Sequence, residues 1–381
     1  MTRLTSHIDG DILTGSDWNS IRRESQPFLF GNETSGNVVI STNTSITADW
    51  DVTNLTISGG TVITVTSGKR IRIAETLTLI GTGATILAAP CNNGVGSGGA
   101  QETAQAGRGG MGGSGGGFIG IFCQNFSGNG LISVNGYSGL AAVECSDVDG
   151  TGGNGLAGSA MTYLGMFISG AGGTSANAEL GAGSGGAGTS TSTPGVGGAG
   201  GFRRHSARVR IRDDLGYFNA QFTSDVAGTG GGGGTGFRSA ASSIAGGGGG
   251  GGGGFIGSGG AGGTGGAATG TSNGHSGNGG GGGGAGGCLW FVARNFLGTP
   301  TAVLSAKGAG GAASSNASSA TEGAGGGAGG GGGGLILYWA PTSLTTSIAG
   351  GALGAKSSTG NGGTDGGVGQ SGVATYLGAW G

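Results

Sequence analysis

Hydrophobic residues in the first quarter of the chain recur in short groups rather than at helical spacing. Between residues 34 and 90, valine, isoleucine and leucine groups return at intervals of roughly six to nine residues, with threonine, serine, glycine and asparagine between them. β-Branched residues bounded by turn residues predict short β-strands. The intervals are too short for helical crossovers, so the pattern predicts a β-helix in which each turn stacks on the one below.

Beyond residue 90, glycine-rich stretches alternate with short apolar strand pairs. The segments 116–134 and 286–306 follow one plan, in which an apolar run leads to Asn-Phe and then to a second apolar run, and a third copy begins at Gly334. The run 71–88 has the same plan without long glycine loops. The expected fold class is therefore all-β, with a β-helix-like spine of short strands whose later turns carry glycine-rich excursions.

Glycine supplies 106 of the 381 residues, about four times the usual share of ~7%. Collagen is excluded because glycine does not recur at every third position and only 5 prolines are present. Ordering a glycine run such as 246–254 costs roughly 1–2 kcal/mol per residue and buries no side chain in return. Backbone hydrogen bonds must offset that cost, so we expect the excursions to pack side by side as polyglycine-II-like helices. Irregular glycine loops are the alternative.

Low charge excludes several function classes. Charged residues make up 9% of the chain and the net charge is −2, so we expect no nucleic-acid binding, which needs clustered lysine and arginine. No run of 18 apolar residues exists, so we expect no membrane insertion. The first residues also lack the apolar core of a secretory signal. No phosphate loop of the GxxxxGK[ST] type and no HExxH motif is present, so the sequence predicts neither a cofactor nor a metal site.

The four cysteines do not identify a metal or redox site. Cys91, Cys123, Cys145 and Cys288 contain no CxxC pair. We interpret them as small buried residues. Three disulfide pairings are also conceivable, and the sequence does not choose among them.

The first 33 residues form a separate segment with little glycine. The stretch Asp9–Asn19 (DGDILTGSDWN) resembles the N-terminal opening of many phage tail-fibre and tail-tip proteins. That resemblance implies a virion-facing segment over 1–33 that binds other virion proteins through Asp11, Ile12, Leu13 and Trp18. The expected organisation is this segment, a β-helical stem over 34–90, and a glycine-rich adhesin region over 91–381.

The texture of residues 92–381 resembles the glycine-rich distal tail-fibre adhesins of T-even-type phages. That resemblance implies polyglycine II helices, variable loops that bind a host-surface glycan or outer-membrane protein, and a place on the phage particle after synthesis in the host cytoplasm. The expected function is a tail fibre or receptor-binding adhesin, not an enzyme. A homotrimer would suit a fibre, and the sequence does not decide it. A structural virion decoration protein and a tailspike-like polysaccharide depolymerase remain alternatives.

One segment concentrates positive charge. Residues 202–226 hold five of the sixteen basic residues, with Val209 and Ile211 alternating with arginines. A receptor or partner contact is one interpretation, because arginine and tyrosine are favoured interface anchors. An edge strand protected by charge is the other. The contact interpretation selects Phe202, Arg203, Arg204, His205, Arg208, Arg210, Arg212, Tyr217 and Phe218.

Paired carboxylates were the main candidates for catalysis. Asp49 and Asp51 stand at alternate positions, as do Asp147 and Asp149, and a glycosidase needs two carboxylates about 5–10 Å apart. Neither pair has nearby histidine, tyrosine and arginine of the kind that perturbs pKa values. We therefore expect no catalytic residue.

Overall fold

A computed structural model describes residues 30–31, 34–90, 109–143, 194–200, 233, 246–254, 257–267, 269 and 275–378. These residues form strands and no helix among their named elements. Seven strands belong to the first part of the chain, namely β1 (Asn37–Ile40), β2 (Thr44–Ile46), β3 (Trp50–Val52), β4 (Asn54–Ile57), β5 (Val62–Val65), β6 (Lys69–Leu79) and β7 (Thr85–Ala88). The later strands are β8 (Phe118–Gly128), β9 (Leu131–Ser133), β10 (Cys288–Phe296), β11 (Val303–Ser305), β12 (Leu335–Trp339), β13 (Thr345–Ser347) and β14 (Val373–Tyr376).

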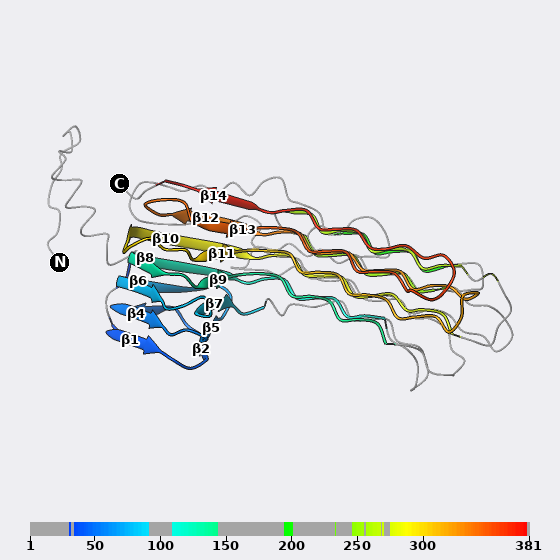
Figure 1. The fold of residues 1–381 in the computed structure, drawn as a ribbon, viewed down its shortest axis with the longest axis horizontal. Helices are drawn as coiled ribbons and strands as arrows, with labels where there is room; N and C mark the ends of the chain where they lie inside the picture. Colours follow the sequence, from blue (N-terminus) through cyan, green and yellow to red (C-terminus); the bar gives the residue numbers. More distant parts are fainter. Residues whose placement is uncertain are drawn as a thin grey trace, which may run out of the picture.

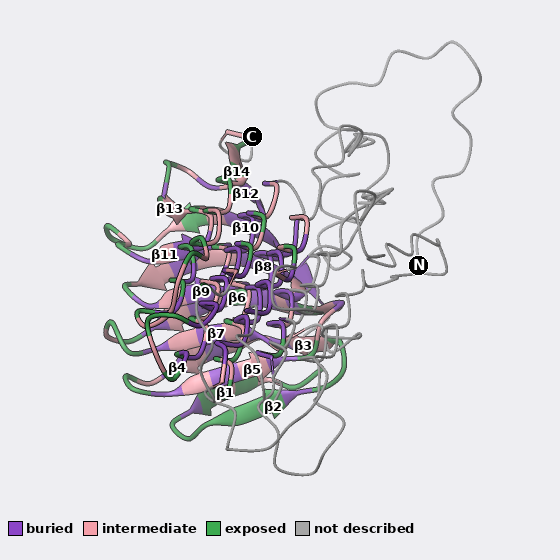
Figure 2. Cartoon of the chain, turned by 90° about the vertical axis from the view of Figure 1, so that its right-hand side faces the viewer, coloured by how far each residue is buried: buried purple, intermediate pink, exposed green. Residues whose placement is uncertain are grey.

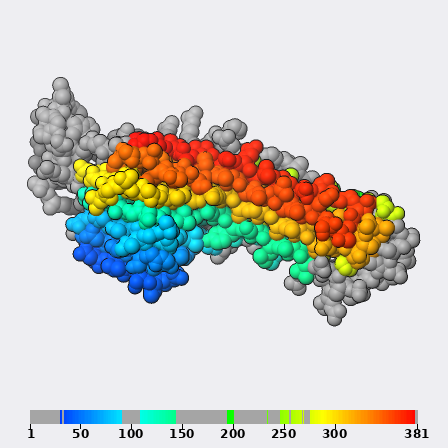
Figure 3. Space-filling view, viewed as in Figure 1, coloured from blue at the N-terminus to red at the C-terminus, as the bar shows by residue number. Residues whose placement is uncertain are grey.

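The described strands form two parallel sheets, and the chain crosses between them. Sheet A has eight strands in the order β1-β4-β6-β8-β10-β12-β14, with β3 also paired to β6. Sheet B has six strands in the order β13-β11-β9-β7-β5-β2. Figure 1 shows the strands stacked at one end of the molecule, with long extended segments leaving them in one direction. The described part is therefore elongated, as Figure 3 also shows.

This arrangement corrects the predicted fold class. The sequence predicted all-β structure with one β-helix-like spine of short strands, and the structure instead has two separate parallel sheets. Short strands were expected throughout residues 34–90, yet β6 is eleven residues long and pairs with β8 through a register shift between Ile73 and Thr76. The polar residues at this bulge resemble a turn in the sequence, because a bulge and a turn both interrupt the alternation of side chains.

The main core lies between the two sheets. Its buried side chains come in rows of register partners, such as Ile71, Ile121, Phe291 and Tyr338 on sheet A. Sheet B contributes the row Ile63, Ile86, Ile132 and Leu304. Figure 2 shows buried, purple positions within the stack of strands and exposed, green turns around it. Side chains stacked this way bury apolar area at every level, which is worth ~25 cal/mol per Å².

A second apolar cluster lies on the opposite face of sheet A. Because side chains alternate along a strand, β10 points Leu289 and Phe291 into the main core and Trp290 into the second cluster. Phe122 contacts Trp290 edge-on at 5.5 Å between ring centroids. Sheet A is thus apolar on both faces at β8, β10 and β12, as expected for a parallel sheet covered on both sides. The other buried members are Phe30, Ala285, Cys288, Val292, Leu335 and Leu337.

The extended segments form what we call the glycine array. In the described part it comprises residues 109–117, 134–143, 194–200, 233, 246–254, 257–267, 275–287, 306–317, 323–334, 348–357 and 364–372. Their backbones hydrogen-bond to one another and belong to neither sheet. Segment 323–334 is bonded to six others, namely 246–254, 257–267, 275–287, 306–317, 348–357 and 364–372.

Hydrogen bonding in the array repeats every three residues. Within 323–334, Gly326, Gly329 and Gly332 donate to segment 246–254 at 2.8–2.9 Å. The next residue of each triplet donates to 364–372, and the third donates to 306–317. Successive N–H groups thus point to three different neighbours, as an extended helix with three residues per turn requires.

Candidate functional site

The array ends in two turns on the side away from the sheets. We call residues 318–322 and 358–363 the distal turns; each connects a segment that leaves the sheets to one that returns (Figure 1). The second turn depends on glycine, because Gly360, Gly362 and Gly363 have φ values of 122°, 66° and 75°. Residues that carry a side chain rarely adopt such φ values, so these positions require glycine.

Asn316, two residues before the first distal turn, contacts the start of the second. Its Oδ1 atom accepts hydrogen bonds from the backbone N of Ser358 at 3.2 Å and from Ser358 Oγ at 3.0 Å. The Ser357 hydroxyl donates to the same atom at 3.4 Å. In the backbone, Ala317 N donates to Thr359 O at 3.3 Å. One exposed asparagine therefore orders the start of the neighbouring turn.

Glu322, the last residue of the first distal turn, is a fully buried acid. Its Oε2 atom accepts a hydrogen bond from Ser318 Oγ at 2.5 Å, and its carbonyl accepts one from Asn361 N at 2.5 Å. A buried carboxylate is costly unless it is hydrogen-bonded, and the Ser318 hydroxyl meets that need within the first turn. The backbone bond from Asn361 N to the Glu322 carbonyl joins the first turn to the second.

Two further segments contact this end of the array. The backbone N of His275 donates to Ser318 Oγ at 2.9 Å, and Ser318 N donates to His275 O at 2.9 Å. Asn361 Nδ2 donates to Ala267 O at 2.9 Å. Segments distant in the sequence thus meet at the distal end of the array. The ring nitrogen Nδ1 of His275 is buried there with no hydrogen-bond partner.

The exposed chemistry of this end is mostly hydroxyl and amide. Its exposed polar side chains include Asn316, Ser318, Thr321, Lys356, Ser358, Thr364 and Asp365. Lys356 and Asp365 are the charged members of this set, and Lys356 N donates to Asp365 Oδ1 at 2.8 Å. The arrangement suits hydrogen bonding to a polar partner. Among the described residues, no group of histidine, cysteine, aspartate or glutamate could hold a metal ion.

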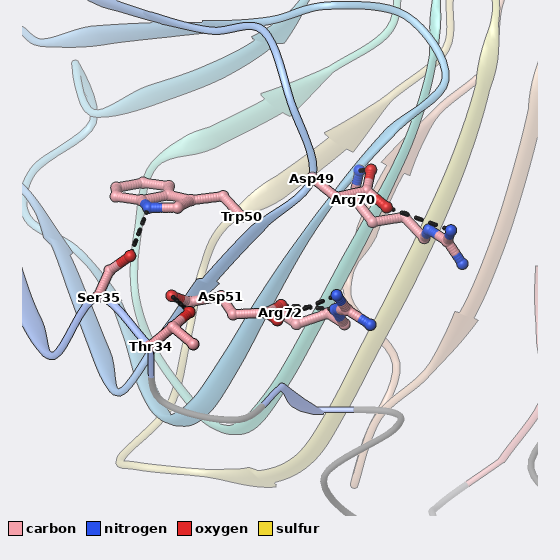
Figure 4. Close-up of polar contacts among 7 residues, drawn as sticks. All are labelled: Thr34, Ser35, Asp49, Trp50, Asp51, Arg70 and Arg72. Carbon is pink, nitrogen blue, oxygen red and sulfur yellow. Dashed lines mark hydrogen bonds and ion pairs between the residues drawn. The ribbon is translucent and has the colours of Figure 1, made fainter.

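A second polar cluster lies on the outer face of sheet A, at β3 and β6 (Figure 4). Arg72 makes a bidentate contact with Asp51, with Nε–Oδ1 at 2.6 Å and Nη2–Oδ2 at 3.0 Å. Arg70 pairs with Asp49 at 3.2 Å. Asp49 and Asp51, one of the two carboxylate pairs weighed for catalysis, are thus each paired with an arginine that the sequence did not place near them, which is an arrangement of structural ion pairs. Asp147 and Asp149 lie outside the described residues.

Residues 34 and 35 cover the open edge of β3. Ser35 N and Thr34 Oγ1 both donate to Asp51 O, at 3.1 and 3.3 Å. Trp50 Nε1 donates to Ser35 Oγ at 3.2 Å (Figure 4). The outer edge of β3 is therefore hydrogen-bonded through its backbone, beside the two ion pairs.

The two described cysteines are buried free thiols. Cys123 faces the main core, where burial raises the pKa of its thiol, and Cys288 belongs to the second apolar cluster. Cys91 and Cys145 lie outside the described residues.

The site residues selected from the sequence fall outside the described part of the chain. These are Asp11, Ile12, Leu13 and Trp18 in the N-terminal segment, and Phe202, Arg203, Arg204, His205, Arg208, Arg210, Arg212, Tyr217 and Phe218 in segment 202–226. They remain predictions.

Sequence reasoning missed the distal turns because it treated 307–334 and 349–374 as uniform glycine-rich stretches. A signal was present: the polar run Asn316–Glu322 interrupts the first stretch near its middle, and Ser357–Asn361 interrupts the second. An excursion that leaves the sheets, turns and returns should contain two glycine runs of similar length with polar turn residues between them.

The described residues contain no helix long and apolar enough to span a membrane. No protein-family model, curated protein or solved structure matches this chain.

Proposed function

We propose that this chain is a structural and adhesive protein of a bacteriophage particle, a tail fibre or receptor-binding adhesin that attaches to the host surface. The observation that supports this most directly is the glycine array, which holds two polar turns away from the sheets by backbone hydrogen bonds. The resemblance of the N-terminal stretch and of the glycine-rich texture to phage fibre proteins points to the same function.

The array supplies stiffness without a side-chain core. Each backbone hydrogen bond contributes about 0.5–1.5 kcal/mol, and central segments such as 323–334 donate at nearly every residue. Many such bonds offset the ordering cost of roughly 1–2 kcal/mol per residue. A protein that must project a contact surface from a particle gains a rigid arm in this way.

The distal turns supply the contact surface. Their exposed hydroxyl and amide groups are held by hydrogen bonds to segments from elsewhere in the chain. A preordered surface loses less conformational entropy on binding, which favours affinity. Its partner in this proposal is a glycan or an outer-membrane protein of the host.

Adsorption competition tests the proposal. Purified protein is incubated with host cells before phage is added, and we expect it to block adsorption. Replacing Thr321 and Ser358 by arginine places bulky charge on both distal turns and should raise the half-blocking concentration at least tenfold. Thr342→Arg, on an exposed turn at the sheet end, is the matched control and should block like the unmodified protein.

Two results would contradict the proposal. Unmodified protein that binds no host cells and blocks no adsorption would leave a purely structural virion protein as the better description. Shortening of host capsule or lipopolysaccharide chains by the purified protein would indicate a depolymerase instead.

A further inference from the structure

The two sheets end differently at the two ends of the stack. At the N-terminal end the first strands of both sheets, β1 and β2, lie at the same level, because each sheet starts with one of them. At the other end sheet A finishes with β14, and no described strand of sheet B follows β13 at that level. The N-terminal end is thus flush, and the other end is staggered by one strand.

The flush end has open hydrogen-bonding edges. Among the described strands, β1 is paired only with β4, and β2 only with β5. Gly36 O and Ile40 O accept bonds from the β4 side, and Ile46 O accepts one from the β5 side. Backbone groups of successive strand residues point to opposite edges, so Val39 and Ser45 direct their N–H and C=O groups away from the sheets.

Neither edge strand carries the features that usually prevent pairing. Proteins protect exposed edges with charged residues, proline or bulges. β1 has the sequence NVVI and β2 has TSI, their registers with β4 and β5 are regular, and Val39 is 70% exposed. By contrast, the neighbouring edge of β3 is covered by Thr34 and Ser35.

We infer that the β1–β2 edge is the docking surface for another virion protein that ends in two parallel β-strands and continues both sheets. Main-chain pairing of this kind gives affinity through backbone hydrogen bonds. This inference rests on the proposed function, because it identifies where the adhesin joins the particle. A second copy of this chain fits poorly, since its staggered end would meet β1 but leave a strand-wide gap at β2.

Proline substitutions test the edge without breaking bonds inside the chain. Val39→Pro and Ser45→Pro remove one outward N–H donor from each edge strand, and proline is tolerated on edge strands. Thr346→Pro is the control, because Ser347 O faces β11 and Thr346 therefore faces away at the opposite edge of sheet B. Each variant is supplied to phage lacking the gene, and copies per particle are counted by quantitative mass spectrometry.

We expect the double variant to be incorporated at least tenfold less than the unmodified protein, while its block of host adsorption as a purified protein is unchanged. The control should be incorporated normally. If the double variant loses its thermal unfolding transition, Val39→Lys, which adds an edge charge, replaces it with the same expected loss.

Three outcomes would overturn the inference. If the folded edge variant is incorporated normally, the β1–β2 edge is not the docking surface, and the proposed function is unaffected. Self-association of the purified protein in sedimentation, abolished by the edge variant, assigns the edge to a second copy. Absence of the unmodified protein from particles rejects the proposed function itself, and the inference with it.

Discussion

Glycine at the centre of the array is fixed by the closeness of neighbouring backbones. A Cβ atom at Gly282 would overlap the carbonyl oxygen of Gly251, and one at Gly331 would overlap that of Gly284. At the surface of the array the restriction ends: a Cβ atom at Gly310 would lie 3.8 Å from its nearest neighbour, Ala352 O. Residue identity in the array therefore follows from the number of neighbouring segments.

Two alanine substitutions compare these positions. We expect Gly282→Ala to lower the free energy of unfolding by about 1–3 kcal/mol or more, because backbone atoms must move apart to admit the methyl group. Gly310→Ala should be neutral or slightly stabilising, since alanine restricts the unfolded chain. Chemical denaturation of the two variants measures the difference, and equal stability would contradict close backbone packing.

Cys123 predicts a loss of stability at alkaline pH. Burial raises the pKa of its thiol above the ordinary value of 9.0, so the folded protein keeps a proton that the unfolded chain releases. The stabilisation of the folded state by the protonated thiol is complete below the pKa of the unfolded chain. It is lost as the pH rises above that pKa, by about 1.4 kcal/mol per pH unit.

The measurement compares the unmodified protein with Cys123→Ala. Urea denaturation at pH 8 and pH 10.5 should show a smaller decrease in stability for the alanine variant. The other cysteines are common to both proteins, so their titration cancels. The same decrease in both would show that the Cys123 thiol ionises as readily in the folded state.

At the scale of elements, strands of sheet A extend further than their apolar groups suggest. β6 continues through the bulge near Glu75, and β8 pairs with it on both sides of that bulge. This length lets β6 pair with both β3 and β4, and so places Arg70 and Arg72 beside Asp49 and Asp51. The ion pairs follow from the strand pairing.

The two ion pairs should differ in strength. Arg72→Lys loses the bidentate geometry in a half-buried position, and we expect a loss of about 1 kcal/mol. Arg70→Lys changes a more exposed pair, with a side chain 52% exposed, and should cost less. Thermal unfolding of both variants in low and high salt checks this order, and a larger effect at Arg70 would reverse it.

The molecule as a whole is stabilised in two ways, by side-chain burial in the sheets and by backbone hydrogen bonding in the array. The sheets bury rows of apolar side chains between them, and the array pairs backbone groups with little apolar area. They share chain segments, because 275–287 leads directly into β10 and 323–334 leads into β12. The direction of the array is therefore set by the direction of the strands.

The three-residue repeat predicts the effect of deletions on the edge of the array. Removing residues 352–354 together with 366–368 shifts both edge segments by one full repeat, so the remaining N–H groups can still meet acceptors. Removing only Ala352 and Gly367 shifts the donors between the two deleted positions out of phase. We expect the smaller deletion to lower the unfolding temperature more, as measured by calorimetry. The opposite order would mean that the repeat does not determine the pairing.

Parts of this structure could be predicted from particular residues. The inward positions of Ile71, Ile73, Leu77 and Leu79 follow from alternation, and all four are buried. Their union in one strand could not be predicted, because the register shift between Ile73 and Thr76 interrupts the alternation of side chains. The sites selected over 1–33 and 202–226 remain predictions, and the distal turns were missed because glycine composition hid the polar breaks.

The sequence by itself determined that glycine strings must satisfy their backbone groups with one another, because a run such as 246–254 has no side chains to bury. It also determined which strand positions are apolar. Only the tertiary structure decided that the strands divide into two parallel sheets and which segments neighbour each other in the array. Those choices depend on contacts between residues far apart in the chain, and identical glycine runs carry no side-chain signal to distinguish one neighbour from another.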